Sequence, residues 1–311
     1  MKVYRNCLVL LVVIMTSACS DWLTVNPKNQ KQEDDLFSTG TGYRTALNGI
    51  YQQLSEGTVY GREMTWGFMS VIGQNYEWDG LRSTAYKDAG AYEYGTAGCS
   101  GIIDAIWSKA YNSIANCNNL IQRVEEVNED IFDYKYIEKS MIAGEAYALR
   151  AFLHFDLLRL FGPVYKTHKE DKSICYNTQF SLSGSDLLPA SKVMEYVIAD
   201  LKEAEDRLAK DPIIEEGPLL SDGATEEEDF WRYRSLRLNY YAVKALQARA
   251  YLYAEMNEDA LEAARTVVAV QEKWFPFLEY SAIVGNSKTP NRVFSTELLF
   301  CMQNTKLIRC M

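Results

Sequence analysis

Aromatic, amide and carboxylate side chains are concentrated in one short segment, residues 74–79, which reads Gln-Asn-Tyr-Glu-Trp-Asp. Trp and Tyr rings stack on the apolar faces of sugars, and Asn and Asp side chains pair with sugar hydroxyls. Tyr92 and Tyr94 follow in the same region. We therefore predict that a saccharide binds here through five side chains: Trp78, Tyr76, Asp79, Asn75 and Tyr86. The alternative is that these rings only cover the helices beside them.

Cys19 predicts chemistry of another kind, the attachment of a lipid. The chain starts with basic Lys2 and Arg5, continues with an apolar run over residues 7–15, and reaches the cysteine through small residues at 16–18. This succession is typical of a bacterial lipoprotein signal peptide, whose removal leaves a thiol that accepts a diacylglycerol. The apolar run is shorter than the ~20 residues that span a bilayer as a helix. An ordinary cleaved signal and a retained anchor are the alternatives.

Catalytic motifs are missing from the sequence. It contains neither G-x-S-x-G nor H-E-x-x-H, and its glycine-rich residues 95–101 lack the spacing and the Lys of a phosphate-binding loop, so we predict a flexible loop there. His154 and Asp156 are two residues apart on a predicted helix and point to different faces. An ordinary polar helix face with Arg150 and Arg159 is the simpler interpretation. We predict no catalytic residue, metal site or cofactor.

The charge balance excludes some classes of partner. The chain has 32 basic and 42 acidic residues, a formal net charge of −10, without a long run of Lys or Arg. Such a chain repels nucleic acid and bare anionic lipid surfaces. A hydrophobic content of 48% is sufficient for a globular core in one large domain or two small ones.

Cysteine and histidine are too scattered to indicate a metal site or a redox motif. The chain has two histidines, and its cysteines show no CxxC spacing. Once Cys7 leaves with the signal and Cys19 carries lipid, the remaining thiols are an odd set: Cys99, Cys117, Cys175, Cys301 and Cys310. We predict isolated buried thiols, and the sequence leaves any disulfide pairing open.

Helical periodicity dominates the rest of the chain. Apolar residues recur at spacings of three and four over residues 42–54, 104–127, 137–161, 191–208, 236–254 and 259–271. Ser191 is a candidate cap for one of these helices, and Gly162 with Pro163 ends another.

The last two predicted helices look like a tetratricopeptide repeat. Ala248 and Tyr251 on one helix, with Ala260 and Ala264 on the next, place small residues where two antiparallel helices must approach closely. Because one such pair cannot bury its faces alone, the upstream helices must stack on it. The predicted fold is dominated by α-helix, with tetratricopeptide-like helix pairs, long loops and minor strand.

The segments between the helices show no sustained period. Residues 56–101 are rich in Gly and aromatic residues and predict long loops. Residues 166–188 and 211–235 are insertions, and the second is acidic, so we predict a solvated loop there. Residues 297–302 predict a buried strand.

Several stretches of the mature chain carry a family resemblance. They are Gly144-Glu145-Ala146, Leu149-Arg150-Ala151, Phe155-Asp156-Leu157 and Arg159-Leu160-Phe161-Gly162-Pro163-Val164. With these motifs the chain resembles the SusD/RagB family of outer-membrane lipoproteins, which capture nutrients at the cell surface in Bacteroidota. The resemblance implies a tetratricopeptide-like scaffold whose loops carry the ligand. It also implies a partner, a TonB-dependent transporter of the SusC type, and a surface-exposed, lipid-anchored location.

The resemblance also predicts how the chain is divided. We expect a signal peptide at 1–18, a tether at 19–32, the family's N-terminal helical region at 33–285, and at 286–311 the start of a C-terminal half that is truncated here, because members of the family are longer. The leading interpretation is a non-catalytic receptor for an oligosaccharide or another nutrient, whether glycan or peptide. A lipid-anchored glycan hydrolase and a tetratricopeptide scaffold that binds only protein are the alternatives.

Overall fold

The computed structural model describes residues 28–181, 185–220, 223, 225–284 and 290–303. The predicted signal peptide and Cys19 lie outside the described residues. Within this part every regular element is a helix, apart from one isolated antiparallel bridge between Lys172 and Pro189. No helix of the described part has the length and apolar character needed to cross a membrane.

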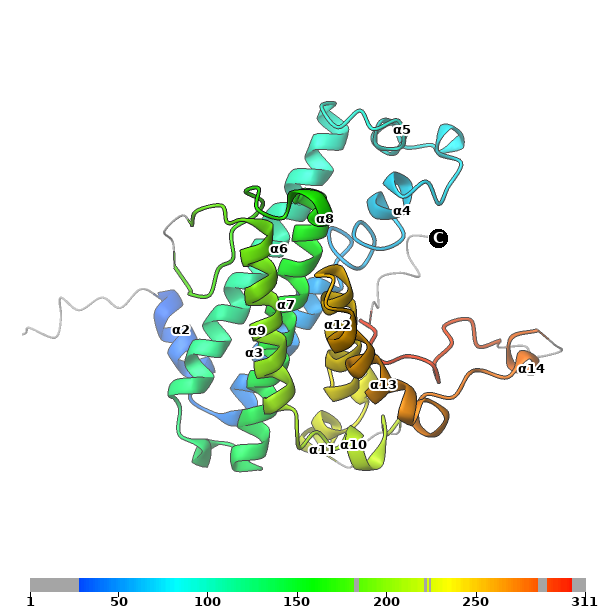
Figure 1. Cartoon of the computed structure of the whole chain (residues 1–311). Helices are drawn as coiled ribbons and strands as arrows, with labels where there is room; N and C mark the ends of the chain where they lie inside the picture. Colours follow the sequence, from blue (N-terminus) through cyan, green and yellow to red (C-terminus); the bar gives the residue numbers. More distant parts are fainter. Residues whose placement is uncertain (1–27, 182–184, 221–222, 224, 285–289, 304–311) are drawn as a thin grey trace, which may run out of the picture.

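Six long helices form the scaffold, as the periodicity predicts (Figure 1). They are α3 (Gly40–Leu54), α6 (Ala97–Glu126), α7 (Lys135–Phe161), α9 (Ala190–Arg207), α12 (Tyr240–Tyr253) and α13 (Asn257–Trp274). Shorter helices surround them: α2 (Lys28–Leu36), α4 (Phe68–Ile72), α5 (Thr84–Gly90), α8 (Tyr165–His168), α10 (Ile213–Glu216), α11 (Glu226–Trp231) and α14 (Tyr280–Ile283).

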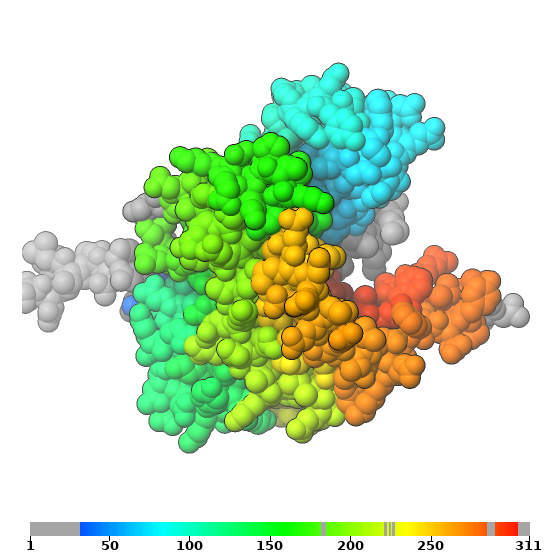
Figure 2. All heavy atoms as spheres, viewed as in Figure 1, coloured from blue at the N-terminus to red at the C-terminus, as the bar shows by residue number. Residues whose placement is uncertain are grey.

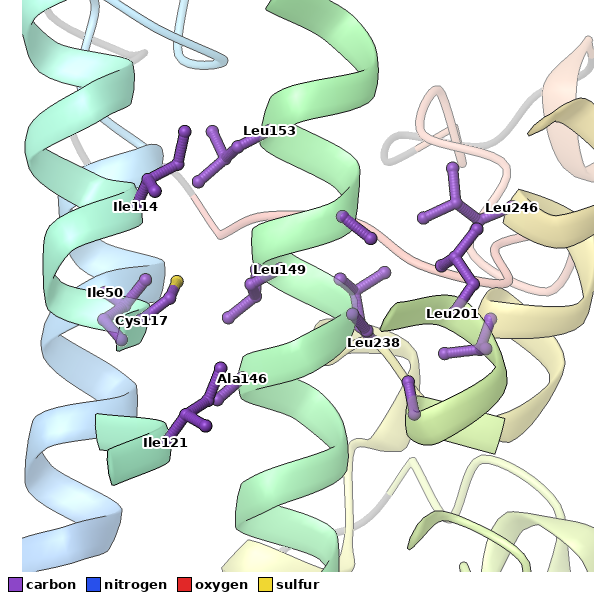
Figure 3. Close-up of a cluster of buried hydrophobic side chains, with 14 of the residues drawn as sticks. Ile50, Ile114, Cys117, Ile121, Ala146, Leu149, Leu153, Leu201, Leu238 and Leu246 are labelled. Carbon is purple, nitrogen blue, oxygen red and sulfur yellow. The ribbon is translucent and has the colours of Figure 1, made fainter. Parts of the chain in front are cut away.

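Helix α7 lies at the centre because it is apolar on several faces. It packs against α6 on one side and α9 on the other, and α12 continues the stack from α9 to α13. Figure 3 shows this core, with side chains that meet between α3, α6 and α7 or gather around α9 and α12: Ile50, Ile114, Cys117, Ile121, Ala146, Leu149, Leu153, Leu201, Leu238 and Leu246. The layered helix pairs confirm the predicted tetratricopeptide-like fold.

Small residues allow the close approach of α7 to α9 and of α12 to α13. A Cβ on Gly144 of α7 would lie 2.8 Å from Cγ of Leu208 and 3.2 Å from the carbonyl oxygen of Ala204, so only glycine lets α9 approach this closely. Between α12 and α13, Tyr251 packs against Ala260 and Ala263. The predicted contact is confirmed there, with Ala263 more deeply buried than the expected Ala264.

The acidic insertion is only in part the solvated loop that its composition predicts: Glu215, Glu216 and Asp229 are exposed, but the segment is folded. It forms α10 and α11, and both Asp211 and Arg234 are buried. Arg234 donates to Asp211 at 3.0 and 2.8 Å and to Glu145 of α7 at 2.6 Å. A buried arginine balanced by two carboxylates is tolerated because each charge has a partner. This ion cluster therefore ties residues 211–235 to the centre of the scaffold.

Two predicted loops and one predicted strand also differ from the structure. Residues 97–101 form the start of α6, which Thr96 caps: its hydroxyl accepts a hydrogen bond from the Cys99 amide at 3.4 Å. Residues 56–101 contain α4 and α5, which are too short to show a period. Residues 297–302 form no strand, because no described strand lies beside them. Phe300 packs against Tyr51 and Phe152 instead.

Several helix starts differ from the prediction: α6 begins at Ala97, seven residues before the predicted start at 104, and α12 begins at Tyr240, four residues after 236. Helix α2 begins at Lys28, inside the predicted tether. Helix α9 begins after Pro189, so Ser191 lies within the helix and does not cap it. The Ser191 hydroxyl donates to the Glu170 carboxylate at 3.1 Å. Proline favours the start of a helix because its missing N–H would have no partner there.

Candidate ligand-binding surface

A small lobe, which we call the knob (residues 59–96), stands away from the helical scaffold (Figures 1 and 2). It contains α4, α5 and the 3-10 turn Trp78–Gly80. Its own hydrophobic cluster joins it to the first half of α6 through the buried residues Phe68, Val71, Ala89, Cys99 and Ile106. At its base the Tyr60 hydroxyl donates to Asp156 of α7 at 2.9 Å. The knob is therefore a packed unit.

Glu63 organises the interior of the knob. Its side chain is buried, and Oε2 accepts hydrogen bonds from the Phe68 amide at 3.1 Å and the Tyr86 hydroxyl at 2.9 Å. Arg62 Nε lies 2.7 Å from Oε1. One carboxylate thus fixes the start of α4, the ring on α5 and the loop that precedes them.

Four aromatic rings of the knob are exposed to solvent: Trp66 (43%), Tyr76 (41%), Tyr92 (54%) and Tyr94 (42%). The Tyr76 hydroxyl donates to the Trp66 carbonyl at 2.8 Å, and the Tyr92 hydroxyl donates to the Ile72 carbonyl at 3.3 Å. The rings of Tyr92 and Tyr94 meet edge to face, 6.2 Å apart. These bonds restrain the rings while their faces stay open to a ligand.

The backbone of the knob is held in an uncommon conformation at two positions. Gln74 and Tyr92 have φ values of 57° and 61°, in the left-handed region that residues other than glycine seldom adopt. The Gln74 side chain donates to the Gly90 carbonyl at 2.9 Å, which holds the two halves of the knob together. Such strained positions are enriched at binding sites, where the surrounding structure compensates for them.

The predicted site residues divide into two groups in the structure. The side chains of Tyr76, Asn75 and Asp79 are exposed. Trp78 is partly buried against Gly90, since a Cβ on Gly90 would lie 2.4 Å from Cγ of Trp78. Tyr86 points inward to Glu63, and burial raises its pKa to about 12. Contact of these five side chains with a ligand stays a prediction.

Trp66 and Glu63 are the residues of the knob that sequence reasoning missed. Trp66 stands in a stretch without periodicity, so nothing separates it from a ring that covers the scaffold. Glu63 is one of 42 acidic residues, and its burial depends on contacts made after folding. The clustering of Gly and aromatic residues is the sequence signal that marks the region.

The other chemistry-bearing residues are packed apart from one another. His154 lies against the Arg150 carbonyl and the Asn177 amide, whereas Asp156 accepts from Tyr60 and Arg159. Cys99, Cys117, Cys175 and Cys301 are free thiols, while Cys310 lies outside the described residues. In the part of the chain that the structure describes, no three His, Cys, Asp or Glu side chains are arranged to hold a metal ion.

Comparison with known proteins identifies relatives over most of the scaffold. Residues 21–252 match the SusD-like family model, described as "Starch-binding associating with outer membrane". SusD-like protein P2 of Formosa agariphila is 28% identical over 215 residues, which are 67% of this chain and 38% of that protein. SusD-like protein P38 of the same organism is 22% identical over 67% of this chain and 39% of its own length.

Solved structures agree with this match. A SusD superfamily protein from Bacteroides thetaiotaomicron aligns with a TM-score of 0.58 and 25% identity, over 78% of this chain and 48% of that one. A SusD-like carbohydrate binding protein from Bacteroides vulgatus aligns with a TM-score of 0.57 and 19% identity, over 79% and 48%, which shows the shared fold. The chain thus spans about two fifths of these curated relatives and about half of these solved ones. Because the family match covers most of the 311 residues, the chain belongs to the SusD-like family.

Proposed function

We propose that this protein is a non-catalytic receptor, anchored by a lipid on Cys19 at the surface of the outer membrane. It captures an oligosaccharide and delivers it to a SusC-like TonB-dependent transporter. Membership of a family described as starch-binding and associated with the outer membrane supports the ligand class and the location.

The observation that carries this proposal is the set of exposed rings on the knob. Trp66, Tyr76, Tyr92 and Tyr94 present ring faces to solvent, although the knob has its own core in which to bury apolar groups. Stacking on a sugar ring would remove these faces from water, and the neighbouring Asn75 and Asp79 offer partners for hydroxyl groups. We assign the ligand-binding surface to these exposed residues of the knob.

The predicted lipid anchor suits a receptor that stays close to the membrane. Helix α2 begins at Lys28, nine residues after Cys19. A fully extended chain of that length reaches at most about 30 Å. A lipid on Cys19 would therefore keep the scaffold within the reach of a transporter in the same membrane.

Calorimetric titration of the mature protein with neutral oligosaccharides tests the proposal. Maltoheptaose is the first ligand because of the family's description, followed by cellohexaose, xylohexaose, laminarihexaose and mannohexaose. Trp66→Ala and Tyr76→Ala should each weaken binding several-fold, since one lost ring contact costs about 1 kcal/mol. Tyr280→Ala is the matched control, because Tyr280 is 73% exposed outside the knob.

Three results would contradict the proposal. Unchanged affinity of both knob variants for a glycan that the wild type binds would exclude this surface. Shortening of a glycan by the purified protein, detected by chromatography, would favour the hydrolase. Absence of binding to every glycan, together with co-purification of the transporter, would favour a scaffold that binds only protein.

A further inference from the structure

A hollow lies on the scaffold, and none of the exposed rings of the knob borders it. It has a volume of about 800 Å³ and is bordered by α2, α3, α6 and Phe180. Phe180 also borders a hollow of about 560 Å³, which is lined by Asn118, Gln122, Thr178 and Gln179. We call the two together the amide groove. Ligand-binding cavities in proteins typically have volumes of 300–1,000 Å³, roughly the size of each hollow.

Side-chain amides line the groove from two facing helices. Asn116 of α6 donates to Gln53 Oε1 of α3 at 2.9 Å, and Gln53 donates in turn to Asn112. Gln52 and Asn119 also border the larger hollow, above the apolar Leu36, Phe37 and Ile50. Carboxamides supply donors and acceptors together, which matches the hydroxyl groups of a sugar.

The charged groups of the groove are already paired. Lys109 lies 3.0 Å from Glu56, and Glu33 accepts from Asn119 at 2.9 Å and from Arg123 at 3.3 Å. Each of the charged side chains Glu33, Glu56 and Lys109 therefore has an opposite charge beside it, and none of the three stands unpaired toward a charged ligand. Its chemistry fits a neutral ligand.

Phe180 is held at the centre of the groove by buried residues beneath its loop. Asn118 donates to the carbonyls of Asn177 and Gln179 at 3.0 and 3.2 Å, and Arg150 donates to the Thr178 carbonyl at 3.4 Å. Phe180 itself is 51% exposed and belongs to none of the hydrophobic clusters of the described residues. The loop thus presents an apolar ring to solvent in a fixed place.

Gly49, in the middle of α3, leaves one wall of the groove open. It borders the groove, and a Cβ at this position would meet nothing within 4 Å. Glycine destabilises a helix by about 1 kcal/mol relative to alanine, and no packing contact in the structure requires it here. An open backbone at this position leaves room for a ligand.

We propose that the amide groove is a second saccharide-binding site, which takes a neutral linear oligosaccharide long enough to pass over Phe180. The inference rests on the proposed function, because it deepens the capture of oligosaccharide by this chain. The sugar rings stack on Phe180, and the hydroxyls pair with the amides of α3 and α6.

The test uses the mature protein and the same five neutral oligosaccharides. Phe180→Ala should weaken the binding of at least one of them by about three- to tenfold, as the loss of one ring contact predicts. Gly49→Phe should weaken it at least as much by filling the groove. Gly49→Ala is the matched control, because a methyl group stabilises the helix and leaves the groove open. Phe277→Ala controls for the loss of an exposed ring elsewhere, since Phe277 is 74% exposed.

The outcomes separate the two proposals. Weaker binding in both groove variants, with unchanged melting temperatures and unchanged controls, supports the groove. If the groove variants bind every glycan as the wild type does while Tyr76→Ala weakens binding, the groove inference is overturned and the receptor stands. If no oligosaccharide binds the wild type, both proposals fall.

Discussion

Acid should destabilise this protein through His154. The ring is fully buried and stacks on Tyr176 at a centroid distance of 3.8 Å. Nε2 accepts a hydrogen bond from the Asn177 amide at 3.1 Å, so the ring proton lies on Nδ1, which donates to the Arg150 carbonyl at 2.9 Å. Protonation would destroy the first bond and place a charge in the core.

The magnitude follows from the shift of the His154 pKa. Burial, opposed by the bond to the Arg150 carbonyl and assisted by the Arg150 charge, lowers this pKa to about 3. In the unfolded chain the pKa of histidine is about 6.5. Below that pH the unfolded state gains a proton that the folded state does not bind, so stability falls until the folded pKa is reached. Between pH 7 and pH 5 the loss is about 2 kcal/mol.

Urea unfolding at pH 7 and pH 5 measures this loss. His154→Gln removes the titrating ring. The free energy of unfolding of this variant should therefore fall by about 2 kcal/mol less than that of the wild type between pH 7 and pH 5. Carboxylates titrate in both proteins and cancel in the difference. His168→Gln is the matched control, because this second histidine is exposed. An equal loss in wild type and His154→Gln would refute the reasoning.

Three further changes test other parts of the molecule. Cys19→Ala should abolish incorporation of labelled fatty acid and release the protein from the membrane fraction, and equal labelling of both proteins would defeat the lipoprotein prediction. Gly90→Ala should lower the free energy of unfolding in urea by about 1–3 kcal/mol, because the new methyl group displaces the Trp78 ring. An unchanged unfolding midpoint would show that Trp78 moves freely. Arg234→Met should lower the free energy of unfolding by about 3–5 kcal/mol, because it leaves the buried Asp211 without its ionic partner and Glu145 with Arg237 alone. A loss below 1 kcal/mol would show that water reaches this cluster.

The long helices could be predicted because their signals are local. Residues 137–161 are the clearest example of a local signal. Their long apolar pattern ends at Gly162, whose amide donates a hydrogen bond to the Leu158 carbonyl. The buried role of Asp211 could not be predicted in this way. Its charge is balanced by Arg234, which pairs also with Glu145 in a distant part of the sequence. A run of acidic residues, taken alone, therefore predicts a solvent-exposed loop.

The location of the candidate site could be predicted, but the orientation of its rings could not. Composition singles out residues 74–79, which the structure places on the knob. Trp78 is the larger ring, yet it turns partly inward because Gly90 leaves a gap for it. Tyr76 turns outward because its hydroxyl reaches the Trp66 carbonyl. Both outcomes depend on contacts between segments that have no sequence pattern in common.

Three polar side chains of helix α7 each form a hydrogen bond with one of the segments between the long helices. Glu145 holds Arg234 of the acidic insertion, Arg150 holds the carbonyl beneath Phe180, and Asp156 holds Tyr60 at the base of the knob. Two of these contacts, at Arg234 and Tyr60, lie close to one end of their segment, and none of the three involves an exposed ring. Exchange of the exposed rings therefore leaves the attachment intact, and a scaffold of this kind can evolve toward a new ligand without redesign of its core.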